Sequence, residues 1–111
     1  MKIKSIILLL IAASFSTIGN FLIKKASESP SLIKSIFEIK FVFGVFFYGL
    51  NLLVFLFVLK SENVSKAYPI LATLSFILLT LLSYLYLDEK FSLINILGLI
   101  IIILGIYFLS K

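Results

Sequence analysis

Four long stretches of this 111-residue chain contain no charged residue, and this spacing of charges constrains the fold more than any other feature. The stretches cover residues 5–23, 41–59, 67–87 and 91–109. As a helix, each would be roughly 30 Å long, which matches the hydrocarbon core of a bilayer. Their apolar residues are continuous rather than alternating, which favours helices over a β-barrel. The sequence therefore predicts an all-α membrane protein, a four-transmembrane-helix bundle with both termini on the same side.

The composition agrees with a chain that is solvated mainly by lipid. Hydrophobic residues make up 62% of the sequence, and the mean hydropathy is +1.25. A soluble domain of this size could not bury so much apolar surface. No linker or low-complexity segment interrupts the chain, so residues 1–111 are predicted to form a single transmembrane domain.

The first stretch also resembles a cleaved signal peptide, because "MKIKSIILLLIAAS" has a basic start, an apolar core and small residues. The apolar run continues to Ile23, however, which is too long for such a segment. An uncleaved first helix is therefore predicted. In the following connection, Ser29 and Pro30 resemble a helix start, with the serine as cap. That connection contains either a short interfacial helix or an early start of the second span.

The lysines leave the orientation in the membrane open. Four spans would place five lysines on each side: Lys2, Lys4, Lys60, Lys66 and Lys111 on one, and Lys24, Lys25, Lys34, Lys40 and Lys90 on the other. The positive-inside rule then gives no preference. Either the protein inserts both ways and forms an antiparallel pair, or the adjacent Lys24 and Lys25, or a partner protein, decide the orientation.

Several function classes are excluded. The chain has no cysteine and no histidine, and its five acidic residues all lie in connections between the apolar stretches. We therefore expect no enzyme activity, no metal site and no cofactor. The lysines flank the apolar stretches, where they anchor a helix to lipid headgroups, and so do not predict nucleic-acid binding.

Polar residues within the stretches are the candidate binding residues. Ser16, Asn20 and Lys24 are four residues apart and share one helix face that leads to the membrane edge. An anion entering there would meet an ammonium, an amide and a hydroxyl in turn, and lysine suits a phosphate. Alternatively, Ser16 and Asn20 bond a neighbouring helix and Lys24 reaches the interface as an anchor. Tyr68 is either an interfacial anchor or a cavity wall, and Pro69 is expected in the first turn of its helix.

Glycines suggest where helices approach one another. Gly98 and Gly105 are seven residues apart and nearly aligned on the last predicted helix. They predict either a dimer seam or close packing within one bundle. Gly19 and Gly44 could serve the same purpose in the first two helices.

The whole chain resembles the small four-helix members of the drug/metabolite transporter superfamily, which include small multidrug resistance proteins and EamA-type half-transporters. The resemblance rests on "GNFLIKKA" at 19–26, "VSKAYPILATLSFILLT" at 64–80 and "YLDEKFSLINILGLIIIILGIYF" at 86–108. The multidrug antiporters carry a membrane-embedded glutamate, and the matching position here is Ser16. A serine cannot exchange protons in the physiological range, so the resemblance does not imply proton-coupled cation export.

The chain is most similar to the subunits of the bacterial flippase for aminoarabinose linked to undecaprenyl phosphate. Those subunits also lack the glutamate and share the glycine–lysine spacing of Gly19 and Lys24 and the "AYP" at 67–69. The resemblance implies an inner-membrane transporter subunit that moves a lipid-linked or other amphiphilic anion, as a homodimer or with a similar partner. The expected substrate-binding residues are Ser16, Asn20, Lys24 and Tyr68. Export of cationic drugs or small metabolites is one alternative, and a non-transporting membrane scaffold that assembles with a larger complex is another.

Overall fold

The computed structural model describes residues 2–109, which form four long helices and one short one and contain no strand. The helices are α1 (Ile3–Ala26), α2 (Leu32–Phe37), α3 (Ile39–Leu59), α4 (Val64–Tyr86) and α5 (Leu93–Leu109). The prediction of an all-helical chain is confirmed. α1, α3 and α4 are long and apolar enough to cross a membrane, whereas α5 has only 17 residues. A helix of that length is about 25 Å long, near the lower limit for a span.

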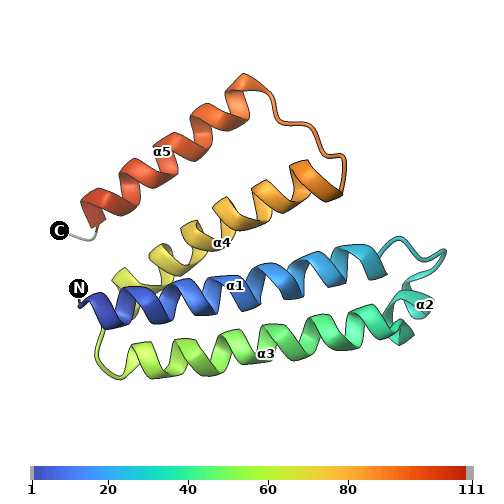
Figure 1. Cartoon of the computed structure of the whole chain (residues 1–111), viewed down its shortest axis with the longest axis horizontal. Helices are drawn as coiled ribbons and strands as arrows, with labels where there is room; N and C mark the ends of the chain where they lie inside the picture. Colours follow the sequence, from blue (N-terminus) through green and yellow to red (C-terminus); the bar gives the residue numbers. More distant parts are fainter. Residues whose placement is uncertain (1, 110–111) are drawn as a thin grey trace.

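The long helices run up and down in a flattened arrangement that measures 46 × 35 × 18 Å. α1 packs along both α3 and α4, while α3 and α4 touch each other much less (Figure 1). α5 returns beside α4, on the side of α4 that faces away from α1 and α3 (Figure 1). α1 begins and α5 ends at the same end of the molecule.

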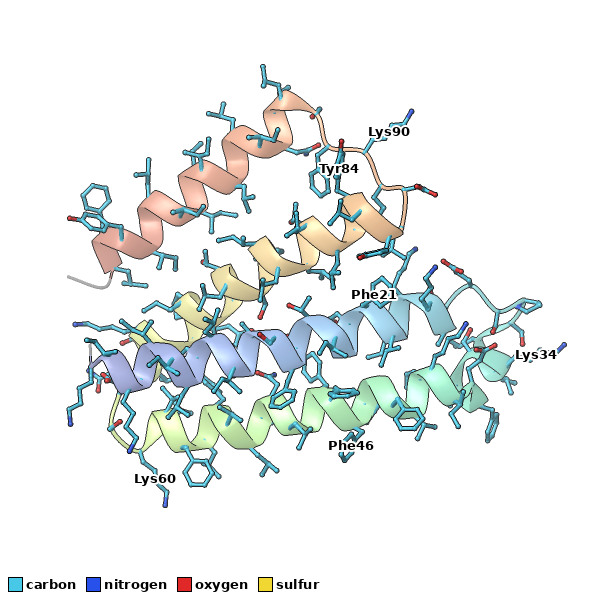
Figure 2. All side chains as sticks on the ribbon, viewed as in Figure 1. Phe21, Lys34, Phe46, Lys60, Tyr84 and Lys90 are labelled. Carbon is cyan, nitrogen blue, oxygen red and sulfur yellow. The ribbon has the colours of Figure 1, made fainter. Side chains whose placement is uncertain are left out.

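Charged residues gather at the two ends of this arrangement. Lys60 lies at the end where α3 turns into α4, and Lys34 and Lys90 lie at the opposite end (Figure 2). Lys24 and Lys25 complete the last turn of α1, where positive charge interacts favourably with the helix dipole. Two charged ends separated by apolar helices are what a bilayer-spanning bundle requires.

The buried core joins α1, α3 and α4 at the end where α1 begins. Its members are Leu9, Ala12, Ala13, Val58, Ala67 and Leu71. Three of these six are alanines, and small side chains let helix backbones approach closely where no hydrophobic effect drives association in lipid. α5 contributes no buried residue among those that the structure describes.

The predicted position of Pro69 is wrong, and two helices begin a few residues away from the ends of the charge-free stretches. α4 begins at Val64, so Pro69 lies inside the helix rather than in its first turn. The predicted boundary at residue 67 followed the charge of Lys66, but a charge at the membrane edge does not end a helix. α5 begins at Leu93 instead of residue 91 because Ser92 and Asn95 cap it reciprocally: the Ser92 amide donates to Asn95 Oδ1 at 3.0 Å, and the Asn95 amide donates to Ser92 Oγ at 3.4 Å.

The connection after α1 contains a separate short helix, so the alternative of an early second span is wrong. The cap of α2 is Ser31, whose hydroxyl accepts a hydrogen bond from the Lys34 amide at 3.2 Å. Ser29, the expected cap, instead donates to Glu38 Oε1 at 2.6 Å. Glu38 has an extended backbone, which separates α2 from α3.

Candidate functional site

A cavity of about 240 Å³, with a mostly apolar lining that includes several polar side chains, lies between α1, α3 and α4. Each helix lines it with one face. α1 contributes Ser16 and Asn20, four residues apart. The lining residues of α3 and α4 also follow helical spacing: Tyr48, Asn51, Leu52 and Phe55 on α3, and Tyr68, Leu71, Ala72, Ser75, Phe76 and Leu79 on α4.

Three of the four predicted binding residues meet in this cavity. Ser16 is buried, with 5% of its surface exposed, and its Oγ accepts a long hydrogen bond of 3.4 Å from Asn20 Nδ2. Tyr68 reaches the cavity from α4 and packs against the Phe55 ring at 6.1 Å between centroids. The two α1 side chains thus bond each other, and the hydrogen bond to a neighbouring helix that the alternative predicted is not formed within the described residues.

Lys24 does not line the cavity. It lies one turn beyond Asn20 and is exposed. Its neighbour Lys25 places Nζ 6.0 Å from the centre of the Phe21 ring, and Phe21 packs edge-on against Tyr86 of α4. The positive charges therefore stand at the end of α1, outside the polar space that Ser16 and Asn20 enter.

Two cavity residues on α3 were missed from the sequence. Asn51 lies near the middle of α3 and is only 4% exposed, and Tyr48 is one turn earlier. A signal was available, since Asn51 is the sole amide in an otherwise apolar run over residues 41–59. A strongly polar side chain in the centre of a span is costly in lipid and therefore marks a candidate site.

Among residues 2–109, no charged side chain lines the cavity. α3 and α4 contact each other little, which leaves the side between them open. The large side chains on that side are exposed: Tyr48, Leu52, Tyr68 and Phe76. In a bilayer, exposed side chains at this depth face lipid. The arrangement can thus receive a small polar group through the side of the bundle. Among residues 2–109, no cluster of acidic side chains could hold a metal ion.

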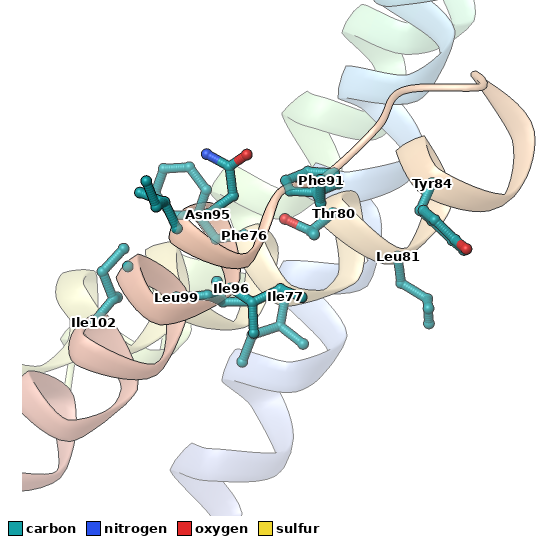
Figure 3. Close-up of a pocket in the computed structure, with 12 residues that line it drawn as sticks. Phe76, Ile77, Thr80, Leu81, Tyr84, Phe91, Asn95, Ile96, Leu99 and Ile102 are labelled. Carbon is teal, nitrogen blue, oxygen red and sulfur yellow. The ribbon is translucent and has the colours of Figure 1, made fainter.

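A second, wider space of about 750 Å³ separates α4 from α5. Its lining is almost entirely apolar, and the side chains of Phe76 and Thr80 on α4 lie across from Asn95 and Leu99 on α5 (Figure 3). Gly98 borders this space, and a Cβ added at Gly98 or Gly105 would meet no atom within 4 Å. Neither glycine provides close packing within the described chain.

Comparisons with known proteins agree with this architecture. The model of the EamA-like transporter family matches residues 2–111. The uncharacterized protein y4nH of Sinorhizobium fredii (strain NBRC 101917 / NGR234) is 42% identical over 110 residues, covering 96% of this chain and 94% of that protein. The uncharacterized membrane protein YvaE of Bacillus subtilis (strain 168) is 30% identical over 104 residues, covering 94% of this chain and 82% of that protein. The chain is thus a multi-pass membrane protein that belongs to the EamA-like transporter family, within the drug/metabolite transporter superfamily.

Proposed function

We propose that this chain is a subunit of a transporter in the bacterial cytoplasmic membrane that moves an amphiphilic, lipid-linked anion such as a polyprenyl phosphate derivative. The observation that carries the proposal is the small cavity with polar but uncharged side chains in its lining, whose open side carries exposed apolar and aromatic residues. A substrate with a long hydrocarbon chain can leave that chain in lipid while its head enters between α3 and α4. Only the head group then needs a polar path, and this cavity is large enough for a small head group.

The position of the lysines supports a phosphate at the membrane edge. Lys24 follows Asn20 by one turn on α1 and is exposed at the end of the bundle, with Lys25 beside it. A lysine ammonium binds phosphate as a point charge. A phosphate held there would stay near the interface, where a charge costs far less than at the bilayer centre. The head that it carries would reach Asn20 and Ser16 below.

The working unit is proposed to have two four-span subunits, either two copies or one copy and a similar partner. α5 has the apolar composition of a span but buries none of its described residues within the chain. Gly98 and Gly105 are open on this helix, and small residues of this kind support close contact between membrane helices. A second subunit packed on α5 would cover this surface and complete a longer path.

A lipid-scrambling measurement tests the proposal. Vesicles would contain the full chain and a fluorescent polyprenyl phosphate, and a membrane-impermeant quencher would report how fast the probe changes leaflet. We expect faster exchange than in empty vesicles, and slower exchange with Lys24→Ala than with Lys34→Ala. Lys34 is the matched control because it is an exposed lysine on α2, away from the cavity. Exchange at the rate of empty vesicles would refute the function.

Export of cationic drugs or small metabolites is the second candidate, because aromatic rings are prominent in the cavity. Its lining includes Tyr48, Phe55, Tyr68 and Phe76. Aromatic faces attract quaternary ammonium groups, by about 0.5–2 kcal/mol each. Saturable uptake of labelled tetraethylammonium into vesicles that contain the protein, without faster exchange of polyprenyl phosphate between the leaflets, would favour this candidate.

A further inference from the structure

One buried polar atom in the cavity is left without a partner. Asn51 lines the cavity from the middle of α3, and its Oδ1 is enclosed with no hydrogen bond to any described residue. Buried side-chain oxygens in folded proteins nearly always accept a hydrogen bond, and an unsatisfied one costs stability. A helix in lipid could carry a leucine here at no such cost. The amide therefore indicates a function other than stabilising the bundle.

No donor from a neighbouring helix bonds this oxygen among the described residues. The buried hydroxyl of Thr17 donates to its own helix, with Oγ1 2.8 Å from the Ala13 carbonyl oxygen. An amide oxygen needs a donor instead, and the backbone N–H groups within a helix are already used. Asn20 Nδ2, an amide donor in the cavity, bonds Ser16 Oγ instead. A molecule that enters the cavity can supply the donor that Asn51 Oδ1 lacks.

The rest of the lining restricts what that donor can be. No lysine, aspartate or glutamate among the described residues lines the cavity, so an ion brought into it would lose its hydration without gaining a counter-charge. A volume of about 240 Å³ is also below the usual range of pockets for drug-sized ligands, about 300–1,000 Å³. Aromatic rings and amides together suit a small, neutral group with several hydroxyls, because the rings pack on its apolar faces and the amides bond its edges.

We propose that Asn51 is a specificity residue that accepts a hydrogen bond from a hydroxyl of the substrate's neutral head group. Rotation about the soft Cβ–Cγ bond presents Oδ1 to the cavity. Ser16 and Asn20, whose mutual hydrogen bond is long, exchange it for bonds to the same head group. The inference rests on the proposed function for the amphiphilic nature of the substrate. It adds the chemistry of the part that enters: hydroxylated and uncharged.

Binding, rather than transport, tests this inference, so that it can fail separately from the proposed function. The probes are octyl glucoside and its fully O-methylated counterpart, which has the same chain and ring but no donor. Affinity for the full chain in phosphatidylcholine nanodiscs can be followed by tyrosine fluorescence, since Tyr48 and Tyr68 line the cavity. We expect the wild type to bind octyl glucoside about tenfold more tightly than the methylated probe, as a single well-placed hydrogen bond allows.

Asn51→Leu should remove this preference and at the same time raise the thermal unfolding temperature, because the unsatisfied oxygen is gone. A purely structural asparagine would behave in the opposite way, with lower stability and an unchanged preference. Thr73→Ala is the control for loss of a buried polar group elsewhere on α4, because Thr73 is 6% exposed and does not line the cavity, and it should keep the preference. If Asn51→Leu fails to fold, Asn51→Val serves for the same comparison.

Three results would overturn the inference. They are equal binding of the two probes by the wild type, a preference that survives in Asn51→Leu, and tighter Asn51-dependent binding of octylammonium than of octyl glucoside. The last would assign the donor to an amine. Because none of these measurements needs movement across the membrane, a protein that binds the hydroxylated probe through Asn51 but scrambles no lipid would refute the proposed function alone.

Discussion

Gly19 and Gly44 face each other where α1 crosses α3, and their backbones touch. A Cβ built on Gly19 would lie 2.8 Å from the Gly44 carbonyl oxygen, and one built on Gly44 would lie 2.9 Å from the Gly19 carbonyl oxygen. These neighbours are backbone atoms, which cannot move aside as a flexible side chain would. The crossing therefore requires glycine at both positions, and it sets the distance between α1 and α3, which both line the cavity.

Alanine at either glycine of this crossing should loosen the bundle. Gly44→Ala is expected to lower the free energy of unfolding by about 1–3 kcal/mol, because the added methyl forces the backbones apart. Gly49→Ala is the matched control on the same helix, since a Cβ there meets nothing within 4 Å. It should be neutral or slightly stabilising because alanine is the better helix former. Equal effects of the two substitutions in a denaturant titration in micelles would contradict this account.

The core where α1 begins should respond to cavity formation. Leu9 is fully buried in the cluster with Val58 and Leu71, whereas the adjacent Leu10 is exposed. Leu9→Ala is expected to lower the free energy of unfolding by about 2–4 kcal/mol, since the space that it leaves cannot fully collapse. Leu10→Ala should cost much less. Thermal unfolding of both variants checks the difference, and similar melting temperatures would place this core elsewhere.

The open surface of α5 should respond to substitution through association rather than folding. Gly98→Leu adds a large side chain where the described chain offers open space, so the melting temperature of the single subunit should hardly change. If a second subunit packs on this surface, the dimer fraction should fall. Energy transfer between differently labelled copies in vesicles measures that fraction. Gly49→Leu provides the control, and an unchanged dimer fraction in Gly98→Leu would exclude this seam.

Glu62 provides a pH-dependent contact at the turn between α3 and α4. A hydrogen bond from the Ser5 side chain lowers the pKa of this carboxyl below its ordinary value, with a smaller contribution from Lys2. Because the pKa is lower in the folded than in the unfolded state, the stabilisation is present above the unfolded pKa and is lost as the pH falls through the folded one. The effect should be small, since water and salt screen this surface group.

Ser5→Ala should raise the pKa of Glu62 towards its ordinary value. A carbon-detected NMR titration of labelled glutamate measures this shift. Ser14→Ala is the control, because Ser14 is exposed and donates to the Leu10 carbonyl of its own helix at 2.9 Å. An unchanged Glu62 titration in Ser5→Ala would show that another group lowers the pKa.

Much of the candidate site could be predicted from one-dimensional spacing, and part of it could not. Ser16 and Asn20 were identified because residues four apart share a helix face, and they do line the cavity together. The same spacing placed Lys24 with them, but the face leaves the bundle before Lys24, which is exposed. How far along a helix its face stays buried depends on how the helices cross. The spacing of residues within one helix carries no information about the crossing.

The sequence by itself determined that this protein lies in a lipid bilayer and that it is helical. In lipid, the backbone of a long uncharged run can form all its hydrogen bonds within its own segment only as a helix. The tertiary structure alone decided which polar residues meet. Asn51 and Tyr68 lie on different helices, and they reach one cavity because Gly19 and Gly44 let α1 and α3 touch while α4 packs on the other side of α1. Contacts between distant segments depend on the steric fit between helices at such crossings, and no local sequence pattern encodes that fit.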